Sequence, residues 1–409
     1  MPRLAEINPF SPESIEDPRA FWQAMRTEKP VYQVPGTGFF AISRYEDALH
    51  VLTNEEIFSS NQPPGMQMPP GPEIEEILKQ GYPPANTLLT NDPPSHTRFR
   101  ALVNKAFSPR RVATMEPKIR EIANTLVDAF IGDGRVELVA QFAVGLPLTV
   151  IADSLGVARQ DMEKFKKWSD DSVAPLGGMI SYERQIECAR SLVEFQHYFA
   201  ARLEERRLEP RDDLLTDLLN ARLDGMESLN LPEMLSILQQ LLVAGNETTT
   251  NLIASAMMIL LREPRQMAAL GEDPSLISNF VEEALRMESP VSALFRVTKV
   301  DTEVGGVRIP AGSQIIVIYG SANRDDGQFP GADRMDIRRD NARTHLAFGQ
   351  GVHFCIGAAL ARQEGRIAFE TLLGRLNNIR LTPGRNDFTH TPSFILRGLK
   401  ELWLEFEAV

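Results

Sequence analysis

A glycine-rich stretch near the C-terminus contains Cys355, the residue with the most distinctive chemical setting. The stretch HLAFGQGVHFCIG, residues 345–357, surrounds this cysteine with three glycines and two aromatic rings. Glycine allows backbone to approach a flat partner closely and allows amide groups to point at the sulfur. A thiolate that accepts N–H hydrogen bonds is stabilised, and its donor strength is tuned. The pattern predicts a functional thiolate at Cys355. The second cysteine, Cys188, lies in a helical stretch, YERQIECARSLVEF, and is predicted to be a buried structural thiol.

Several kinds of site could use one such thiol. A zinc site needs about four Cys or His ligands, and only His345 and His353 are near Cys355 in the sequence. The C-x-x-C-H motif of covalent haem attachment is absent. A catalytic Cys/His pair stays open, although His353 is only two residues away in an extended loop. A single thiolate as the axial ligand of a haem fits the pattern best.

The stretch FGQGVHFCIG resembles the haem-binding signature of cytochromes P450, Phe-Gly-x-Gly-x-His-x-Cys-x-Gly. The resemblance extends over nearly the whole chain, in the family's order, through DPPSHTRFR, AGNETTT, EEALR, SANRD and LARQEGRIAFETLL. It implies a mainly α fold with small β-sheets, the triangular prism of the family with its long central I helix. It also implies one haem domain over residues 1–409 and haem b as cofactor. Cys355 would be the axial ligand, Phe348 would pack near the sulfur, and Gly349 and Gly357 would shape the loop.

Four basic residues match the family's haem-propionate binders. Buried carboxylates need cationic or hydrogen-bonding partners. The matching positions are His96, Arg100, Arg296 and His353. His96 and Arg100 are four residues apart and would share one helical face. Arg98, in the same stretch, is expected to be an ordinary surface charge.

Two further pairs of residues are matched by the resemblance. Glu283 and Arg286 would form the family's buried, structural ion pair, joined by Arg338 or Arg339, and the alternative is a surface pair one helical turn apart. Glu247 and Thr248 resemble the acid–alcohol pair that delivers protons to bound dioxygen. The alternative there is a run of threonines that packs the helix, which is the role expected of Thr249 and Thr250. Beside the pair, the resemblance places an oxygen-binding groove at Ala244 and Gly245.

Substrate-contacting residues are placed more loosely. Positions 240, 243, 244 and 248 share one helical face, so three residues are expected to approach the cavity along with Thr248: Gln240, Val243 and Ala244. Gln240 could instead point into a neighbouring helix or to water. The resemblance adds Val291 and Leu294 over the haem, and Phe394 and Ile395 at a C-terminal turn. Apolar residues of the irregular segment 61–95 are expected to form the roof: Met66, Met68, Leu88 and Leu89. The predicted pocket is mainly apolar.

The remaining pattern predicts the elements that position these residues. Residues 30–60 read as strands and a helix, and residues 97–285 as mostly helical. Within them, a long helix is expected to begin after Asn230, with Glu233 as capping-box partner, and to end at Pro264. Short strands are expected after residue 297, followed by the cysteine loop and a helix. The tail LRGLKELWLEFEA alternates like a pair of strands.

Bulk composition is that of a globular protein. The chain has 409 residues, 43% apolar and 24% charged, with a formal net charge of −12. The acidic balance argues weakly against nucleic-acid binding. Two cysteines cannot build a disulfide framework, which favours a reducing compartment. The N-terminus lacks a signal-peptide pattern, and no stretch approaches the roughly 18 to 20 apolar residues of a membrane span. A cytoplasmic protein without nucleic-acid partner or membrane anchor is expected.

The resemblance implies a monooxygenase that inserts one oxygen atom of O2 into an apolar small molecule. Its electrons would come from a ferredoxin or flavodoxin, because no flavin or nucleotide-binding domain fits within the 409 residues. Arg110, Arg111 and Arg362 are candidates for the basic patch that receives this partner. Two other functions stay open: an H2O2-driven peroxygenase, against which the acid–alcohol pair argues, and a haem-thiolate sensor without turnover. A haem domain excised from a reductase fusion is a further alternative.

Overall fold

The computed structural model describes residues 3–61, 71–177 and 180–409. Their contacts divide the chain into two compact units, which are described separately. Unit 1 comprises Met1–Ser59, Glu116–Leu146 and Thr248–Val409, and unit 2 comprises Ser60–Met115 and Pro147–Glu247. The expectation of one haem domain over the whole chain stays a prediction.

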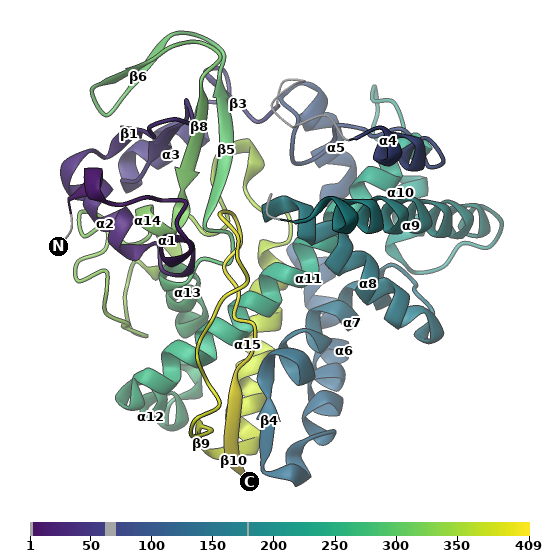
Figure 1. Cartoon of the computed structure of the whole chain (residues 1–409). Coiled ribbons are helices and arrows are strands. Elements are labelled where there is room, and N and C mark those ends of the chain that lie inside the picture. Colours follow the sequence, from purple (N-terminus) through teal and green to yellow (C-terminus); the bar gives the residue numbers. More distant parts are fainter. Residues whose placement is uncertain (1–2, 62–70, 178–179) are drawn as a thin grey trace. The chain divides into compact units, whose positions relative to one another are not determined.

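The main sheet of unit 1 joins strands that are far apart in the sequence (Figure 1). From edge to edge its order is β1 (Val31–Gln33), β2 (Phe40–Ile42), β8 (Gln314–Ile318), β5 (Ala293–Thr298) and β3 (Phe58–Ser59). The pair β2–β8 is parallel and the other neighbours are antiparallel. Helix α3 (Tyr45–Thr53) packs on the sheet through a buried apolar cluster that includes Ile42, Val51 and Val317. The strands and helix predicted for residues 30–60 are confirmed.

Two smaller sheets complete the β-structure among the described residues. One has the order β4 (Arg135–Glu137), β10 (Trp403–Ala408) and β9 (Leu376–Leu381). The other is the hairpin β6 (Thr302–Val304)–β7 (Val307–Ile309). Its two turn residues, Gly305 and Gly306, have φ of 55° and 77°, the left-handed values that favour glycine in tight hairpin turns.

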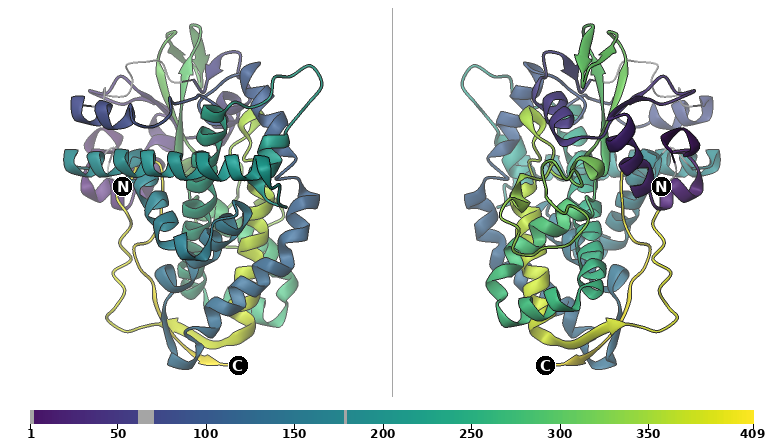
Figure 2. Two further views of the ribbon diagram at one scale, coloured as in Figure 1. Left: turned by 90° about the vertical axis from the view of Figure 1, so that its right-hand side faces the viewer. Right: turned by 90° about the vertical axis from the view of Figure 1, so that its left-hand side faces the viewer.

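The predicted strand pair in the tail is only half right. Residues 403–408 form β10, but residues 396–402 form no strand. Figure 2 shows a long extended segment that leaves β9, reaches the N-terminal helices and returns to β10. Within it only Leu396 and Leu399 form isolated β-bridges, and Arg397 bonds elsewhere: its Nε donates to Glu288 Oε2 at 2.7 Å and its Nη1 donates to the carbonyl of Glu16 at 2.9 Å. Alternation in the sequence does not reveal such bonds.

The other elements of regular secondary structure among the described residues are helices. The helices wholly within unit 1 are α1 (Pro12–Glu16), α2 (Arg19–Glu28), α3, α12 (Pro264–Glu272), α13 (Ile277–Met287), α14 (Tyr319–Ala322) and α15 (Ala358–Arg375). Those wholly within unit 2 are α4 (Pro72–Leu78), α5 (Ser95–Asn104), α8 (Met162–Val173), α9 (Tyr182–Leu208) and α10 (Leu214–Asn220). Three helices contribute residues to both units: α6 (Pro109–Asp128), α7 (Gly145–Ser154) and α11 (Leu231–Arg262). The mainly α class, with small sheets, is confirmed.

Single-turn helices occupy several connections: Leu4–Glu6, Ile131–Asp133, Val139–Ala143, Arg159–Asp161, Ala174–Gly177, Pro274–Leu276, Ala342–Thr344 and Gly351–His353. The irregular segment predicted for residues 61–95 is interrupted by α4, which is a correction. Pro72 at the first position of α4 starts that helix, and Ile74 and Ile77 bury its apolar face beside Ala189 of α9. No helix of the described residues is long and apolar enough to cross a membrane.

Helix α11 begins and ends where the sequence indicates. Its capping box is formed: Asn230 Oδ1 accepts from the backbone N–H of Glu233 at 3.0 Å, and Glu233 Oε2 accepts from the N–H of Asn230 at 2.9 Å. The same carboxylate pairs with Arg98, whose Nη1 lies 2.8 Å from Glu233 Oε1. Arg98 is therefore a partly buried tie between α5 and α11, and its assignment as an ordinary surface charge was wrong.

Candidate functional site

The loop around Cys355 is folded by its own backbone. The N–H of Cys355 donates to the carbonyl of Phe348 at 2.9 Å, and the N–H of Gly349 donates to that of Leu346 at 2.9 Å. Gly349 and Gly351 have φ of 66° and 70°, left-handed values that residues other than glycine rarely adopt. At Gly351 a Cβ would also lie 2.4 Å from the carbonyl oxygen of Leu52. The backbone conformation therefore favours glycine over other residues at both positions.

The two cysteines have different surroundings. Cys355 is partly exposed at the end of its loop, directly before α15. A Cβ on Gly357 would meet its sulfur at 3.9 Å, an ordinary contact, and Gly357 itself has an unstrained φ of −85°. Cys188 is buried in α9, and burial raises the pKa of its thiol. Because a raised pKa keeps a thiol protonated, Cys188 has the character of a structural residue.

Beneath the loop, Glu283 and Arg286 of α13 form a fully buried ion pair. Arg286 Nε lies 2.7 Å from Glu283 Oε2, and both side chains are 0% exposed. Arg339 Nε adds a second cation at 3.1 Å from Glu283 Oε1, whereas Arg338 is exposed. Arg286 also donates to the carbonyls of Asn323 and Ala332, at 2.8 Å each. The ion pair and the hydrogen bonds to these two carbonyls together join α13 to the segment that precedes the cysteine loop.

The four predicted propionate binders lie in two pairs. His96 and Arg100 are on α5 in unit 2, and Arg296 on β5 and His353 in the cysteine loop are in unit 1. His96 is buried; burial, with a smaller contribution from the charge of Arg100, lowers the pKa of its imidazole. A mostly neutral His96 can still donate one hydrogen bond.

Arg296 gives the clearest sign that an anion belongs in unit 1. It is 7% exposed, its Nη1 donates to the carbonyl of Phe295 at 2.7 Å, and it is hydrogen-bonded to Tyr319. Within residues 3–61, 71–177 and 180–409, no carboxylate forms an ion pair with Arg296. A buried guanidinium without an acidic partner is costly. The carboxylate of a haem would supply that partner, so Arg296 fits the cofactor that the cysteine loop indicates.

The middle of α11 differs from the rest of the helix. Val243, Gly245, Glu247 and Thr248 are only partly buried and Ala244 is exposed, whereas every residue from Thr249 to Leu260 is buried. The neighbouring polar residues serve packing instead: Asn246 Nδ2 donates to Ser169 Oγ at 2.8 Å and Thr250 Oγ1 donates to the carbonyl of Ala143 at 3.1 Å. Thr249 is hydrogen-bonded to Glu364. The sequence-predicted groove and acid–alcohol residues therefore form the accessible stripe of the helix.

Gln240 is engaged within unit 2. Its Oε1 accepts from the N–H of Leu89 at 3.1 Å, and its Nε2 donates to Thr87 Oγ1 at 2.7 Å and to Ser236 Oγ at 3.1 Å. This amide fastens the segment before α5 to α11, so it points into a neighbouring non-helical segment rather than into a neighbouring helix or to water. Leu88 of that segment is buried and Leu89 is exposed.

The other predicted pocket residues lie on unit 1 or outside the described residues. Val291 and Leu294 are partly buried and pack against the main apolar cluster. Phe394 stacks edge-on against Phe10 with ring centroids 5.2 Å apart, and the carbonyl of Ile395 accepts from the N–H of Ser292 at 2.6 Å. The predicted roof residues Met66 and Met68 lie outside the described residues.

The proposed electron-partner arginines have different environments. Arg110 is exposed, and Arg111 Nη2 pairs with Asp212 Oδ1 at 2.7 Å on the surface of unit 2. Arg362 is 30% exposed and pairs with the buried Glu282 at 2.7 Å. Arg362 thus forms a structural ion pair and is also partly accessible at the surface.

Among the buried acids that sequence reasoning missed, two lie on helices next to the cysteine loop: Glu282 on α13 and Glu364 on α15. Glu282 is adjacent to Glu283 in EEALR, and that doubled glutamate was the available signal. Glu364 falls on the same face of α15 as the buried Leu360, Ile367 and Ala368, so a charged residue at a core position of the helical period was its signal.

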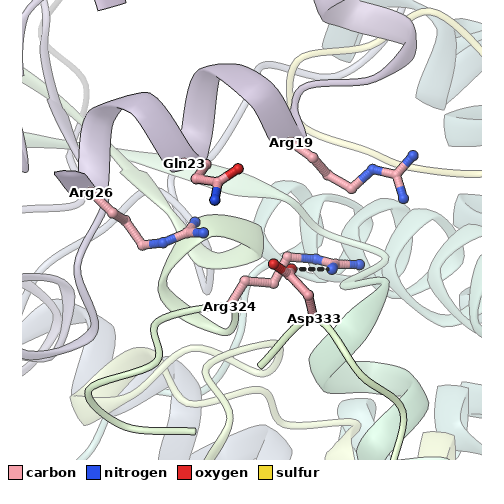
Figure 3. A pocket seen from close by; sticks show the side chains of 5 residues that line it. All are labelled: Arg19, Gln23, Arg26, Arg324 and Asp333. Atoms are coloured by element: carbon pink, nitrogen blue, oxygen red, sulfur yellow. Dashed lines mark hydrogen bonds and ion pairs between the residues drawn. The ribbon is translucent and has the colours of Figure 1, made fainter. Parts of the chain in front are cut away.

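A cavity of about 200 Å³ in unit 1 is lined by none of the predicted site residues. Figure 3 shows Arg19, Gln23 and Arg26 along α2, facing Arg324 and Asp333. Arg324 Nη1 lies 2.9 Å from Asp333 Oδ1, and its Nη2 lies 3.3 Å from Glu288 Oε1. Its charge is balanced within the fold, and the cavity is separate from the predicted chemistry.

Comparison with known proteins agrees with the site. The sequence profile described as Cytochrome P450 matches residues 179–397. Cytochrome P450 107B1 of Saccharopolyspora erythraea is 39% identical over 411 residues, covering 98% of this chain and 97% of that protein. Two solved structures are similar over almost their whole length. Cytochrome P450 CYP109Q5 from Chondromyces apiculatus is 41% identical, with a TM-score of 0.86 and 99% of each chain covered. CYP109E1 from Bacillus megaterium, in complex with testosterone, is 33% identical, with a TM-score of 0.83 and 95% and 99% covered. The chain therefore belongs to the cytochrome P450 family of haem-thiolate monooxygenases.

Proposed function

We propose that this protein holds haem b through Cys355 and inserts one oxygen atom of O2 into an apolar small-molecule substrate. The observation that carries the proposal is the cysteine loop, whose left-handed Gly349 and Gly351 and Cys355–Phe348 hydrogen bond present one partly exposed thiol. When bound, the haem supplies the oxygen-activating redox chemistry.

The chain's own residues have distinct tasks in this proposal. The Cys355 thiolate is the axial ligand, and Phe348, Gly349 and Gly357 surround it. His96, Arg100, Arg296 and His353 hold the two carboxylates of the cofactor. The buried Arg296, which lacks an acidic partner among the described residues, supports this assignment most directly.

Proton delivery is assigned to Glu247 and Thr248. Both lie on the accessible stripe of α11, beside the small residues Ala244 and Gly245. The hydroxyl of Thr248 holds a proton at Oγ1, and the carboxylate of Glu247 replaces it from solvent. The packing roles of Asn246 and Thr250 on the other faces support this division of labour.

An apolar substrate is favoured by the residues proposed to line the pocket: Val243, Ala244, Val291, Leu294, Phe394 and Ile395. The related CYP109E1 has been solved in complex with testosterone, a compound of this class. Gln240, the polar residue among the positions predicted to face the pocket, makes three hydrogen bonds and is therefore a wall element rather than a substrate anchor.

Electrons are proposed to arrive from a ferredoxin or flavodoxin in the cytoplasm. Arg110, Arg111 and Arg362 would meet the acidic surface of such a partner. Swapping each arginine for glutamine should raise the KM for the partner and leave substrate binding unchanged, and the effect should weaken at high salt.

The test begins with the CO difference spectrum of the reduced protein. A Soret band at the position of a thiolate-ligated ferrous-CO haem is expected, and Cys355→Ser should abolish it. Cys188→Ser is the matched control and should leave the band unchanged. A screen of apolar compounds for spin-state shifts, followed by turnover with a surrogate ferredoxin, NADPH and O2, then identifies products. A Cys355→Ser protein that keeps the thiolate band would refute the assignment of the ligand.

A further inference from the structure

Glu282 collects three basic side chains at the base of the cysteine loop. Arg362 donates to it twice, with Nε 2.7 Å from Oε1 and Nη2 3.2 Å from Oε2. His345 Nε2 lies 3.1 Å from Oε2, and Arg343 Nε lies 3.4 Å from Oε1. Glu282 is 1% exposed. Burial raises the pKa of this carboxyl, but the bonds from His345 and Arg362 outweigh burial and leave the pKa at about 2. Glu282 is therefore a buried anion at neutral pH.

These partners flank the cysteine on both sides. His345 begins the glycine-rich stretch ten residues before Cys355, and Arg362 lies on α15, seven residues after it. A single carboxylate on α13 thus fastens the entry and the exit of the loop. The neighbouring Glu283 binds Arg286 and Arg339 instead, so the two adjacent glutamates serve different segments.

Contacts lead from Glu282 to the cysteine itself. The guanidinium of Arg362 lies over the ring of Phe348, 4.6 Å from its centroid, and the ring of His345 lies 5.6 Å from the same ring. The carbonyl of Phe348 accepts the N–H of Cys355 at 2.9 Å. The guanidinium of Arg362 is therefore connected to the backbone of Cys355 through the ring of Phe348 and the hydrogen bond that the Phe348 carbonyl accepts.

We propose that Glu282 is a positioning residue that sets the reduction potential of the haem by balancing the charge of Arg362 beside the Cys355 loop. The proposal rests on the proposed role of Cys355 as the haem ligand. Reduction adds one electron at the iron, so an unbalanced cation nearby favours the ferrous state and an unbalanced anion favours the ferric state. A partly buried charge acts with little screening by salt.

Removing the charge of Glu282 and removing the charge of Arg362 should shift the reduction potential in opposite directions. Glu282→Gln leaves Arg362 unbalanced and should raise the potential, and Arg362→Gln leaves Glu282 with only the exposed Arg343 as a cationic partner and should lower it. Each shift should amount to about a tenfold change in the ferric–ferrous equilibrium, or about 59 mV for one electron. The double variant should return close to the wild-type potential. A residue that only supports the fold would lower thermal stability in each variant without moving the potentials in opposite directions.

The experiment is a spectroelectrochemical titration of the haem-loaded variants, with CO spectra taken first. Arg362→Lys keeps the charge and should restore the potential that Arg362→Gln lowers, which provides a test even where Glu282→Gln fails to fold. Arg343→Gln removes a charge that is 72% exposed and should shift the potential less than Arg362→Gln.

The results separate this proposal from the one on which it rests. A wild-type protein without a thiolate-type CO band overturns the Cys355 assignment and the Glu282 proposal together. A normal band with potentials that stay at the wild-type value, or that fall in both single variants, overturns the Glu282 proposal alone. Equal potentials for Arg362→Lys and Arg362→Gln would also overturn it.

Discussion

Glu364 should make the protein less stable as the pH rises. It lies on α15, is 2% exposed and is hydrogen-bonded to Thr249. Burial raises its pKa to about 8, although the bond from Thr249 acts in the opposite direction. In the unfolded chain the carboxyl loses its proton near its ordinary pKa of 4.5, so between the two values the folded state binds one more proton than the unfolded state. The free energy of unfolding must then fall as the pH increases.

The magnitude follows from the size of the pKa shift. Each pH unit between the two pKa values costs about 1.4 kcal/mol, and the slope flattens near the upper value. From about pH 6 to about pH 8, Glu364 should therefore remove about 2 kcal/mol of stability. Glu364→Gln keeps a polar partner for Thr249 but cannot ionise. The wild-type free energy of unfolding, minus that of the variant, should drop by this amount over the same range.

Urea unfolding of the haem-loaded proteins, followed by far-ultraviolet circular dichroism at several pH values, measures this difference. Glu272→Gln, at an exposed position of α12, is the matched control and should give a difference that does not change with pH. Parallel pH profiles for the wild type and Glu364→Gln would refute the reasoning, because they would mean that Glu364 is already ionised in the folded protein.

The remaining predictions concern other parts of the structure. Thr248→Ala should leave haem and substrate binding intact but divert electrons to hydrogen peroxide; the ratio of peroxide to product measures this, and unchanged coupling would exclude the proton-delivery role. Glu283→Gln leaves Arg286 buried and unpaired and should cost about 3 to 5 kcal/mol in urea unfolding. Gly351→Ala forces a methyl group against the Leu52 carbonyl and should reduce haem retention on gel filtration, with full retention arguing against the close approach. Asn230→Ala removes the cap of α11 and should cost about 1 kcal/mol, whereas Asn230→Ser should be nearly neutral.

Local patterns in the sequence were sufficient for the elements whose cause is local. The capping box of α11 involves residues three apart, and the conformation of the cysteine loop depends on glycines within the loop itself. In both cases the residues that determine the local structure are close together in the sequence. The same holds for Cys188, whose helical surroundings indicated burial.

Elements decided by distant partners were not predictable in this way. Arg98 looked like a surface charge because Glu233, its partner, is 135 residues away. Residues 396–402 alternate like a strand, yet they form only isolated bridges, and Arg397 bonds the distant Glu288 and the Glu16 carbonyl. Glu282 acquires its role only when α13, α15 and the cysteine loop meet. The spacing of residues in the sequence does not indicate these tertiary contacts.

The bond between the two ends of unit 1 has a consequence for how the chain is made. Glu16 accepts hydrogen bonds from the backbone and the ring of His390, which is 374 residues further along. A ribosome that adds about 5 to 20 residues per second needs roughly 20 to 75 s to synthesise that distance. During this interval helix α1 exists without its partner. Helix α1 is therefore made long before it can be anchored, and a chain truncated shortly before His390 would leave α1 undocked.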